Sequence, residues 1–193
     1  HARRNDRLEN EGRLDSPLIK PQRVYAELRK LMPKDAIVAL DAGVGPNFGQ
    51  DRLNFYEPRS LLTSLDLGSL GFSFPAALGT KFAAPDRPVI NFNGDGGFLF
   101  NAQEFATAVR YKLKVITVIL NNDCWGSEKA YQRDAFNQRY VGADTNNPRF
   151  DKYAEIFGGT GFYVDRAQDI GNAFLEALQV DGPSIIEIPV DPD

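Results

Sequence analysis

From residue 21 onward, short runs of β-branched and aliphatic residues alternate with segments whose apolar residues recur at helical spacing. This alternation is typical of an α/β domain with a mainly parallel sheet. Six apolar runs are predicted to be strands, at 36–41, 60–64, 89–93, 115–121, 161–164 and 184–188. Five segments are predicted to be helices, at 21–32, 70–83, 102–111, 150–157 and 167–180.

The run VITVILN at 115–121 is continuously apolar rather than alternating, as expected of a central parallel strand covered on both faces. In sheets of this kind, ligands bind beyond the carboxyl ends of the strands. The residues that directly follow each predicted strand are therefore the first candidates for function.

The composition adds several exclusions. The chain has 193 residues, of which 42% are hydrophobic and 25% charged, and this balance predicts a soluble globular domain. No apolar run reaches the roughly 18 residues of a membrane span and no cleavage pattern opens the chain, so we expect a cytoplasmic protein without membrane contact. A net charge of -4 without a long basic run argues against nucleic acid as a partner. The single cysteine, Cys124, excludes an internal disulfide framework.

The beginning of the chain differs from the rest. It starts at His1 rather than Met, and residues 1–16 are charge-rich without a clear apolar period. We interpret residues 1–16 as a linker or processed N-terminal segment and 17–193 as the folded domain, with a cloning scar or trimmed terminus as the alternative.

Two turns that follow the third and fourth predicted strands carry the candidate chemistry. Asp95, in the run NGDGG at 93–97, offers a carboxylate oxygen, and Asn122 offers an amide oxygen; both suit a small divalent cation that also binds phosphate. The glycines of NGDGG allow main-chain N–H groups to approach an anion, and the helix predicted from 102 adds its positive end. Each turn alone has an ordinary structural alternative, a tight turn or a strand-ending cap. The pair predicts a metal-bridged diphosphate site.

The spacing of these turns resembles the signature of thiamin-diphosphate enzymes, in which GDG is followed about 27 residues later by the second Asn of an NN pair. The whole run GDGGFLFNAQEFATAVRYKLKVITVILNN is similar to acetolactate synthases and their relatives. The resemblance implies that Mg²⁺ is bound by Asp95, Asn122 and the main-chain carbonyl of Cys124.

Two further segments support the resemblance. DLGSLGFSFPAALG at 66–79 is similar to the family's segment beneath the thiazolium ring. The resemblance implies that Leu70 supports the bent conformation of the cofactor and that the carbonyl of Gly68 accepts a hydrogen bond from the aminopyrimidine. The alternative is a glycine-rich helix start with Leu70 in the core. DAGVGPN at 41–47 resembles the family's DVG turn, although an ordinary strand-to-helix turn has the same pattern. The cofactor-binding residues implied are Gly43, Gly45, Asn47, Gly68, Leu70, Gly94, Asp95, Gly96, Gly97, Asn122, Trp125 and Gly126.

Residues 125–142, which follow the predicted metal ligands Asn122 and Cys124, resemble sulfoacetaldehyde acetyltransferases more than acetolactate synthases. The resemblance lies in the spacing of WG-x-EK and of the Gln, Asp, Asn, Arg and VG that follow. In the family this segment lies over the cofactor. The resemblance implies substrate contacts from Trp125, Glu128 and Lys129. The alternative is a solvated helix whose Glu and Lys are surface charges.

The family resemblance also implies the remaining expectations. The fold is a three-layer α/β/α thiamin-diphosphate-binding domain with a six-stranded parallel sheet in the order 2-1-3-4-6-5. The activity is decarboxylation or carboligation of a 2-oxo acid or aldehyde, in a homodimer or homotetramer. The activating glutamate belongs to a separate pyrimidine-binding domain that no segment here resembles, so we expect the 193 residues alone to be inactive and to be the C-terminal part of a longer enzyme.

Two alternatives stay open at this point. The first is the cofactor-binding subunit of a two-subunit decarboxylase similar to sulfopyruvate decarboxylase. The second is a non-catalytic nucleotide-binding module, since glycine-rich turns on parallel sheets also bind dinucleotides. The run GDGG lacks the G-x-G-x-x-G spacing, which argues against the second.

Overall fold

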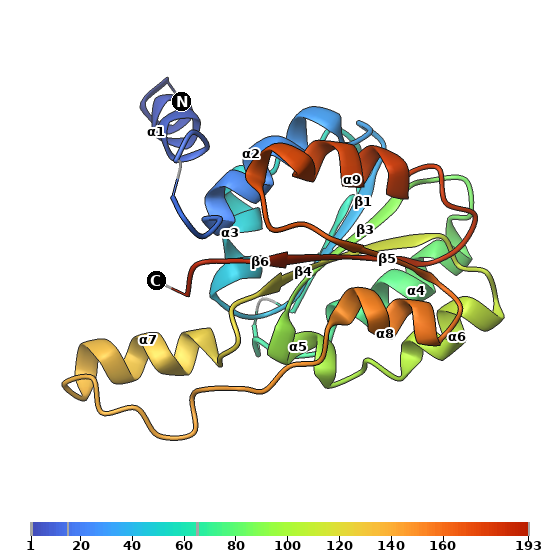
Figure 1. Cartoon of the computed structure of the whole chain (residues 1–193). Helices are drawn as coiled ribbons and strands as arrows, with labels where there is room; N and C mark the ends of the chain where they lie inside the picture. Colours follow the sequence, from blue (N-terminus) through green and yellow to red (C-terminus); the bar gives the residue numbers. More distant parts are fainter. Residues whose placement is uncertain (1, 15, 65, 193) are drawn as a thin grey trace.

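A computed structural model describes residues 2–14, 16–64 and 66–192, and these form a parallel sheet between two layers of helices (Figure 1). The order across the sheet is β2-β1-β3-β4-β6-β5, and each neighbouring pair is parallel. This arrangement confirms the predicted fold class and strand order. The strands are β1 (Ile37–Leu40), β2 (Leu61–Thr63), β3 (Val89–Gly94), β4 (Val115–Asn121), β5 (Thr160–Tyr163) and β6 (Ser184–Pro189).

One face of the sheet is covered by the helices drawn above it in Figure 1. Their buried side chains, such as Tyr25 and Phe174, belong to one apolar cluster with Leu40 and Phe92 of the strands. Each fully buried side chain of this size contributes about 1.5–3 kcal/mol relative to an exposed one. The elements of this layer are α2 (Pro21–Leu31), α3 (Val44–Arg52), the 3-10 turn η1 (Ala167–Asp169) and α9 (Ile170–Ala177).

The opposite face is covered by helices that contribute phenylalanine side chains. The ring centroids of Phe74 and Phe98 lie 5.2 Å apart, and those of Phe98 and Phe150 lie 5.7 Å apart. All seven residues of β4 are buried between the two layers, which confirms the prediction of a central strand. The helices of this layer are α4 (Ser73–Ala83), α5 (Asp95–Leu99), α6 (Glu104–Arg110) and α8 (Phe150–Ile156).

Several helix boundaries differ from the predictions. Helix α4 begins at Ser73 rather than at residue 70, so Leu70 lies in the turn before the helix. Helices α3 and α5 were not predicted, because glycine and proline in their sequences lower helix propensity. Tertiary packing compensates in α3: a Cβ at Gly49 would lie 2.9 Å from Leu40 Cδ2, so this helix lies unusually close to the sheet.

The predicted linker at 1–16 contains helix α1 (Ala2–Glu11), although residues 1 and 15 lie outside the described residues. Ion pairs join this helix to α3: Arg4 and Arg7 contact Asp51, and Glu11 contacts Arg52. Its role as a linker stays a prediction.

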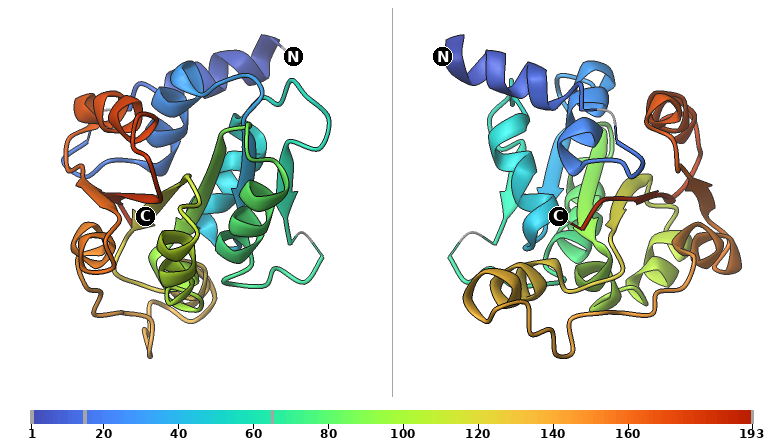
Figure 2. Two further views of the ribbon diagram at one scale, coloured as in Figure 1. Left: turned by 90° about the vertical axis from the view of Figure 1, so that its right-hand side faces the viewer. Right: turned by 60° about the vertical axis from the view of Figure 1, so that its left-hand side comes forward.

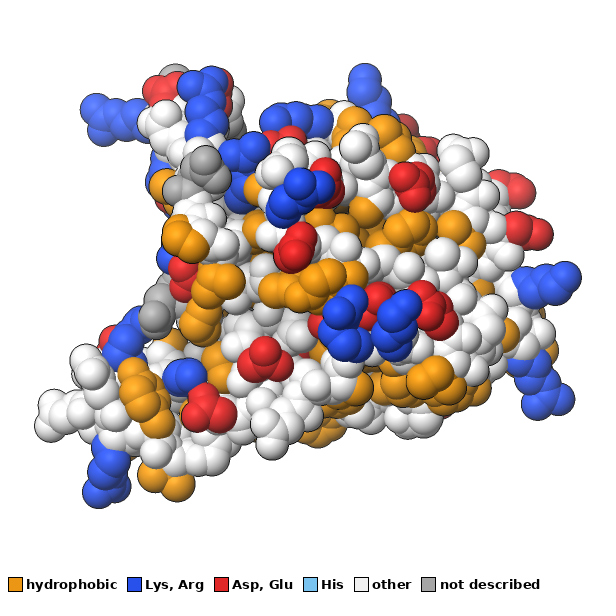
Figure 3. All heavy atoms as spheres, in the orientation of Figure 1, with side chains coloured by type: hydrophobic (Ala, Val, Ile, Leu, Met, Phe, Trp, Pro, Cys, Tyr) orange, Lys and Arg blue, Asp and Glu red, His pale blue; other side chains and the backbone are white. Residues whose placement is uncertain are grey.

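Helix α7 (Gly126–Ala135) projects from the body of the molecule in Figure 1, lies at the lower left in the right-hand view of Figure 2, and has no buried residue. Acidic and basic side chains are interspersed over the face shown in Figure 3. Within the described part of the chain, no helix is both long enough and apolar enough to cross a lipid bilayer.

Candidate functional site

A cavity of about 430 Å³ opens at the carboxyl ends of β1, β3 and β4, and this volume is typical of small-molecule sites. The parallel register pairs Gly94 with Leu120, so the turns after β3 and β4 open at the same edge. All twelve residues that the family resemblance implied for cofactor binding line the cavity: Gly43, Gly45, Asn47, Gly68, Leu70, Gly94, Asp95, Gly96, Gly97, Asn122, Trp125 and Gly126. Their assignment as cofactor contacts stays a prediction.

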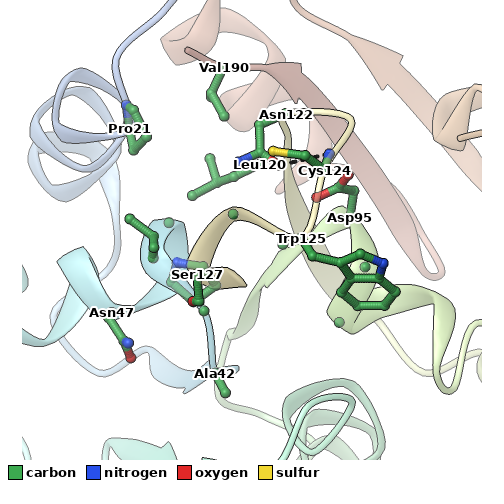
Figure 4. Close-up of a pocket in the computed structure, with 18 of the residues that line it drawn as sticks. Pro21, Ala42, Asn47, Asp95, Leu120, Asn122, Cys124, Trp125, Ser127 and Val190 are labelled. Atoms are coloured by element: carbon green, nitrogen blue, oxygen red, sulfur yellow. Dashed lines mark hydrogen bonds between the residues drawn. The ribbon is translucent and has the colours of Figure 1, made fainter. Parts of the chain in front are cut away.

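The three predicted metal ligands lie together on one wall of this cavity (Figure 4). One end of the Asn122 amide lies 2.9 Å from the Cys124 main-chain oxygen and 3.2 Å from Asp95 Oδ1. With nitrogen at that end, the amide donates to both oxygens. With oxygen there, three hard acceptors converge without a proton between them, and such an oxygen set fits Mg²⁺.

The described residues hold no cluster of three or more His, Cys, Asp or Glu side chains suited to a metal ion. A divalent cation at this wall would therefore be bound by one carboxylate, one amide and one main-chain carbonyl, with phosphate or water completing the shell. Mg²⁺ commonly binds in this way, through one or two carboxylates and substrate phosphates.

The loop between Asn122 and Cys124 turns sharply. Asp123 has φ of +52°, a left-handed conformation that Asp tolerates better than most residues. The loop is also held from outside, because Trp125 N–H donates to the Ala143 carbonyl over 2.7 Å and Thr145 N–H donates to Asp123 over 2.9 Å. The strap, defined as residues 136–149 between α7 and α8, therefore fixes the loop that carries two of the predicted ligands.

Gly96 brings an aromatic ring onto the glycine turn. A Cβ at this position would lie 2.5 Å from Trp125 Cζ3, so only glycine allows the indole to pack against the main chain. The Phe100 ring contacts the same indole edge-on, with centroids 6.0 Å apart. Trp125 is therefore fixed over the turn that also contains Asp95.

Asp95 is 2% exposed, and burial raises the pKa of its carboxyl. Hydrogen bonds from Asn147 and from the Gly96 N–H act in the opposite direction and stabilise the ionised form. A bound cation would do the same, since an opposite charge favours the carboxylate. Burial also raises the pKa of the Cys124 thiol to about 11, so Cys124 is a neutral thiol at physiological pH. It is the main-chain oxygen of Cys124, not its thiol, that faces the predicted metal position.

A second polar network, centred on Asp41, fixes the turn that contains Leu70. Asp41 accepts hydrogen bonds from the main-chain N–H groups of Gly71 (3.0 Å) and Ser73 (3.1 Å), and from the Asn93 amide (2.8 Å). Leu70 itself is half-buried at the cavity wall rather than part of either apolar core cluster.

The predicted substrate contacts separate into two groups. Trp125 and Glu128 line the cavity. Lys129 does not: its ammonium group lies 2.7 Å from Asp144 and 5.6 Å from the centroid of the Tyr140 ring. In this structure Lys129 therefore joins α7 to the strap, and a substrate contact would require that ion pair to open.

Sequence reasoning did not identify Asn147 or the roles of Asp41, Ser73 and Asn93. Asn147 donates to Asp95, and the other three form the network beneath the Leu70 turn. The one signal in the sequence was polar residues at 41 and 93 inside or at the end of otherwise apolar strands. Buried polar side chains of this kind require partners.

Comparison with known proteins identifies a family. The sequence model described as "Thiamine pyrophosphate enzyme, C-terminal TPP binding domain" matches residues 41–188. The chain is 34% identical over 173 residues to sulfoacetaldehyde acetyltransferase from Castellaniella defragrans, covering 90% of this chain and 29% of that protein. It is 32% identical over 171 residues to acetolactate synthase from Bacillus subtilis (strain 168), covering 89% of this chain and 30% of that protein.

Among solved structures, the thiamine diphosphate-dependent 4-hydroxybenzoylformate decarboxylase of Rhodococcus jostii RHA1 matches with a TM-score of 0.86 and 29% identity. The match covers 93% of this chain and 34% of that one. The chain thus spans about a third or less of the length of these relatives. The comparisons confirm the resemblance drawn from the GDG and NN motifs and favour it over both alternatives.

Proposed function

This chain belongs to the thiamine pyrophosphate enzymes, as their C-terminal cofactor-binding domain, and we propose that it binds thiamin diphosphate through Mg²⁺ held by Asp95, Asn122 and the Cys124 carbonyl. The observation that carries this assignment is the convergence of the Asn122 amide, the Asp95 carboxylate and the Cys124 main-chain carbonyl at the cavity wall. These groups come from two turns at one edge of the sheet, beside glycines that leave main-chain N–H groups accessible to a diphosphate.

The residues of the chain have separate tasks in this proposal. When bound, the cofactor supplies the electron sink that 2-oxo acid decarboxylation requires. Gly43, Gly45 and Asn47, at the start of α3, would hold the diphosphate. Leu70 and the Gly68 carbonyl would support its ring system, and the half-buried Trp125 closes the wall beside Gly96.

At the level of the whole enzyme, we propose a 2-oxo acid decarboxylase or carboligase that works on a 2-oxo acid or aldehyde. The named relatives support this class, since they include an acetyltransferase, a synthase and a decarboxylase. A pyrimidine-binding domain, from the same or another chain, would supply the activating glutamate, so the 193 residues alone would bind the cofactor without turnover. Trp125 and Glu128 are the proposed substrate contacts, together with Lys129 when its ion pair with Asp144 opens. A cytoplasmic homodimer or homotetramer completes the proposal.

Calorimetric titration of the chain with thiamin diphosphate, with and without Mg²⁺, tests the assignment. We expect binding that requires Mg²⁺ and is lost in Asp95→Ala, because the only carboxylate of the proposed ligand set is removed. Asp66→Ala, which removes an exposed carboxylate near the Leu70 turn, is the matched control and should bind as the wild type does. Metal-independent binding, or full binding by Asp95→Ala, would refute the ligand set.

A further inference from the structure

Asn147 lies in the strap before α8, and its side chain reaches both turns of the proposed metal site. Its Nδ2 lies 2.5 Å from Asp95 Oδ2, 2.9 Å from Asn121 Oδ1 and 3.1 Å from Asp123 Oδ1. Asp95 is the first residue of α5, directly after β3, whereas Asn121 ends β4 and Asp123 lies in the loop that follows β4. One amide therefore joins the two segments that carry the proposed ligands.

The surroundings of Asn147 fix its amide in a single orientation. Its nitrogen faces three oxygen acceptors, whereas its Oδ1 is buried with no partner. Turning the amide would place its oxygen against those three acceptors, at close range and without a proton. The cost of one unpaired acceptor is thus offset by hydrogen bonding to oxygens, two of which, Asp95 Oδ2 and Asp123 Oδ1, belong to carboxylates.

The position of Asn147 is anchored from the far side as well. Asn121, which accepts from Asn147, donates its own Nδ2 to Glu187 Oε1 over 2.9 Å. Glu187 is 1% exposed, and its other oxygen accepts from the main-chain N–H of Phe150 over 2.8 Å. The chain of hydrogen bonds thus runs from β6 through β4 to Asp95 and ends at the proposed metal site.

From this geometry we propose that Asn147 is a positioning residue for the divalent metal, an inference that rests on the proposed function. Asn147 holds Asp95 Oδ2, which leaves Oδ1 beside the Asn122 amide, and the Cys124 carbonyl lies next to the same amide. It also holds Asp123 in its left-handed turn, between the two other ligands. Outer partners of metal ligands typically contribute about 10–100-fold to metal affinity.

The test is a titration with Mn²⁺ in place of Mg²⁺, in the presence of saturating thiamin diphosphate, with free Mn²⁺ measured by electron paramagnetic resonance. We expect Asn147→Ala and the near-isosteric Asn147→Leu to weaken Mn²⁺ binding about 10–100-fold. The matched control is Asn146→Ala, the same change at the exposed neighbouring residue, which should leave Mn²⁺ affinity unchanged. Circular dichroism checks that each variant is folded, and Asn147→Ser replaces Asn147→Ala if the latter does not fold.

A positioning role has a further signature, because excess metal should compensate for it. At saturating Mn²⁺ the variants should bind thiamin diphosphate within about twofold of the wild type, whereas a merely structural defect lowers cofactor affinity at every metal concentration. Wild-type Mn²⁺ affinity in Asn147→Ala and Asn147→Leu would overturn this inference and leave the proposed function intact. Absence of Mn²⁺ binding by the wild type would instead refute the proposed function.

Discussion

Replacing Asp41 with Asn changes one atom of a buried carboxylate that holds the Leu70 turn of the cavity wall. Asp41 is 1% exposed at the end of β1. Its Oδ1 accepts from the main-chain N–H groups of Ala42 (2.7 Å) and Gly71 (3.0 Å). Its Oδ2 accepts from Ser73 N–H (3.1 Å), Ser73 Oγ (2.9 Å) and Asn93 Nδ2 (2.8 Å). The substitution keeps the shape of the side chain and changes only what it accepts.

The size of the effect follows from counting the donors that lose their acceptor. An Asn amide must direct its NH₂ toward one of the two groups of donors. One group is the main-chain N–H groups of Ala42 and Gly71. The other contains Ser73 N–H and Asn93 Nδ2, and rotation of the Asn93 amide is opposed because its oxygen already accepts from Ser73 Oγ and Asn91 Nδ2. Each buried donor without an acceptor costs about 1–3 kcal/mol, so Asp41→Asn should lower the free energy of unfolding by about 2–6 kcal/mol. With a urea m-value of about 2 kcal/mol/M, the midpoint of unfolding falls by about 1–3 M.

Urea unfolding followed by circular dichroism measures this difference directly. Asp66→Asn is the matched control, because Asp66 is exposed and precedes the turn that Asp41 holds. Surface substitutions of this kind change stability by about 0.5 kcal/mol or less. If Asp41→Asn unfolds at the same urea concentration as Asp66→Asn, the hydrogen bonds assigned to Asp41 do not hold the turn.

Two further predictions concern the metal-side wall. Trp125 is the single tryptophan of the chain, so its fluorescence reports on the cavity: Mg²⁺ with thiamin diphosphate should change the emission of the wild type. Gly96→Ala, whose Cβ would lie 2.5 Å from the indole, should shift the emission before any ligand is added and weaken cofactor binding, whereas an unshifted spectrum would contradict the packing. The Cys124 thiol has its pKa raised to about 11, so only about one molecule in a thousand carries the reactive thiolate near pH 8. Labelling with a disulfide reagent should therefore be slow in the folded chain, become faster as pH rises toward 11, and be fast in concentrated urea; rapid labelling of the folded chain near pH 8 would contradict this burial.

The sheet and the ligand-facing turns could be predicted because their signals are local in sequence. A continuous apolar run such as 115–121 identifies a central strand, and glycines with Asp95 directly after β3 identify the turn at the ligand edge. Helix α3 was missed because its glycines and proline lower local helix propensity, and the contact that compensates joins Gly49 to Leu40 of the sheet. That contact is tertiary, so no local pattern contains it.

The supporting residues escaped prediction for the same physical reason. Asp41 binds Gly71, Ser73 and Asn93, which lie 30, 32 and 52 positions away in sequence. Asn147 lies 52 positions from Asp95. A polar residue whose partner is so distant has no spacing that distinguishes it from a surface residue. The ion pair between Lys129 and Asp144 in the strap was not predicted either, and a substrate contact from Lys129 stays a prediction.

Asp41 and Asn147 support different parts of the cavity, so their loss should affect different properties of the protein. Asp41 joins β1 and β3 to the Leu70 turn, whereas Asn147 joins the β3 turn to the β4 loop. They share only the β3 segment, through Asn93 and Asp95. Loss of Asp41 should therefore lower the free energy of unfolding without changing metal affinity at saturating cofactor. Loss of Asn147 should instead weaken metal affinity and leave the free energy of unfolding nearly unchanged. Combining Asp41→Asn with Asn147→Ala should give additive effects on both quantities, because contacts that share no side chain couple weakly. A strong departure from additivity would mean that the β3 segment transmits strain between the Leu70 turn, which Asp41 holds, and the β4 loop, which Asn147 holds.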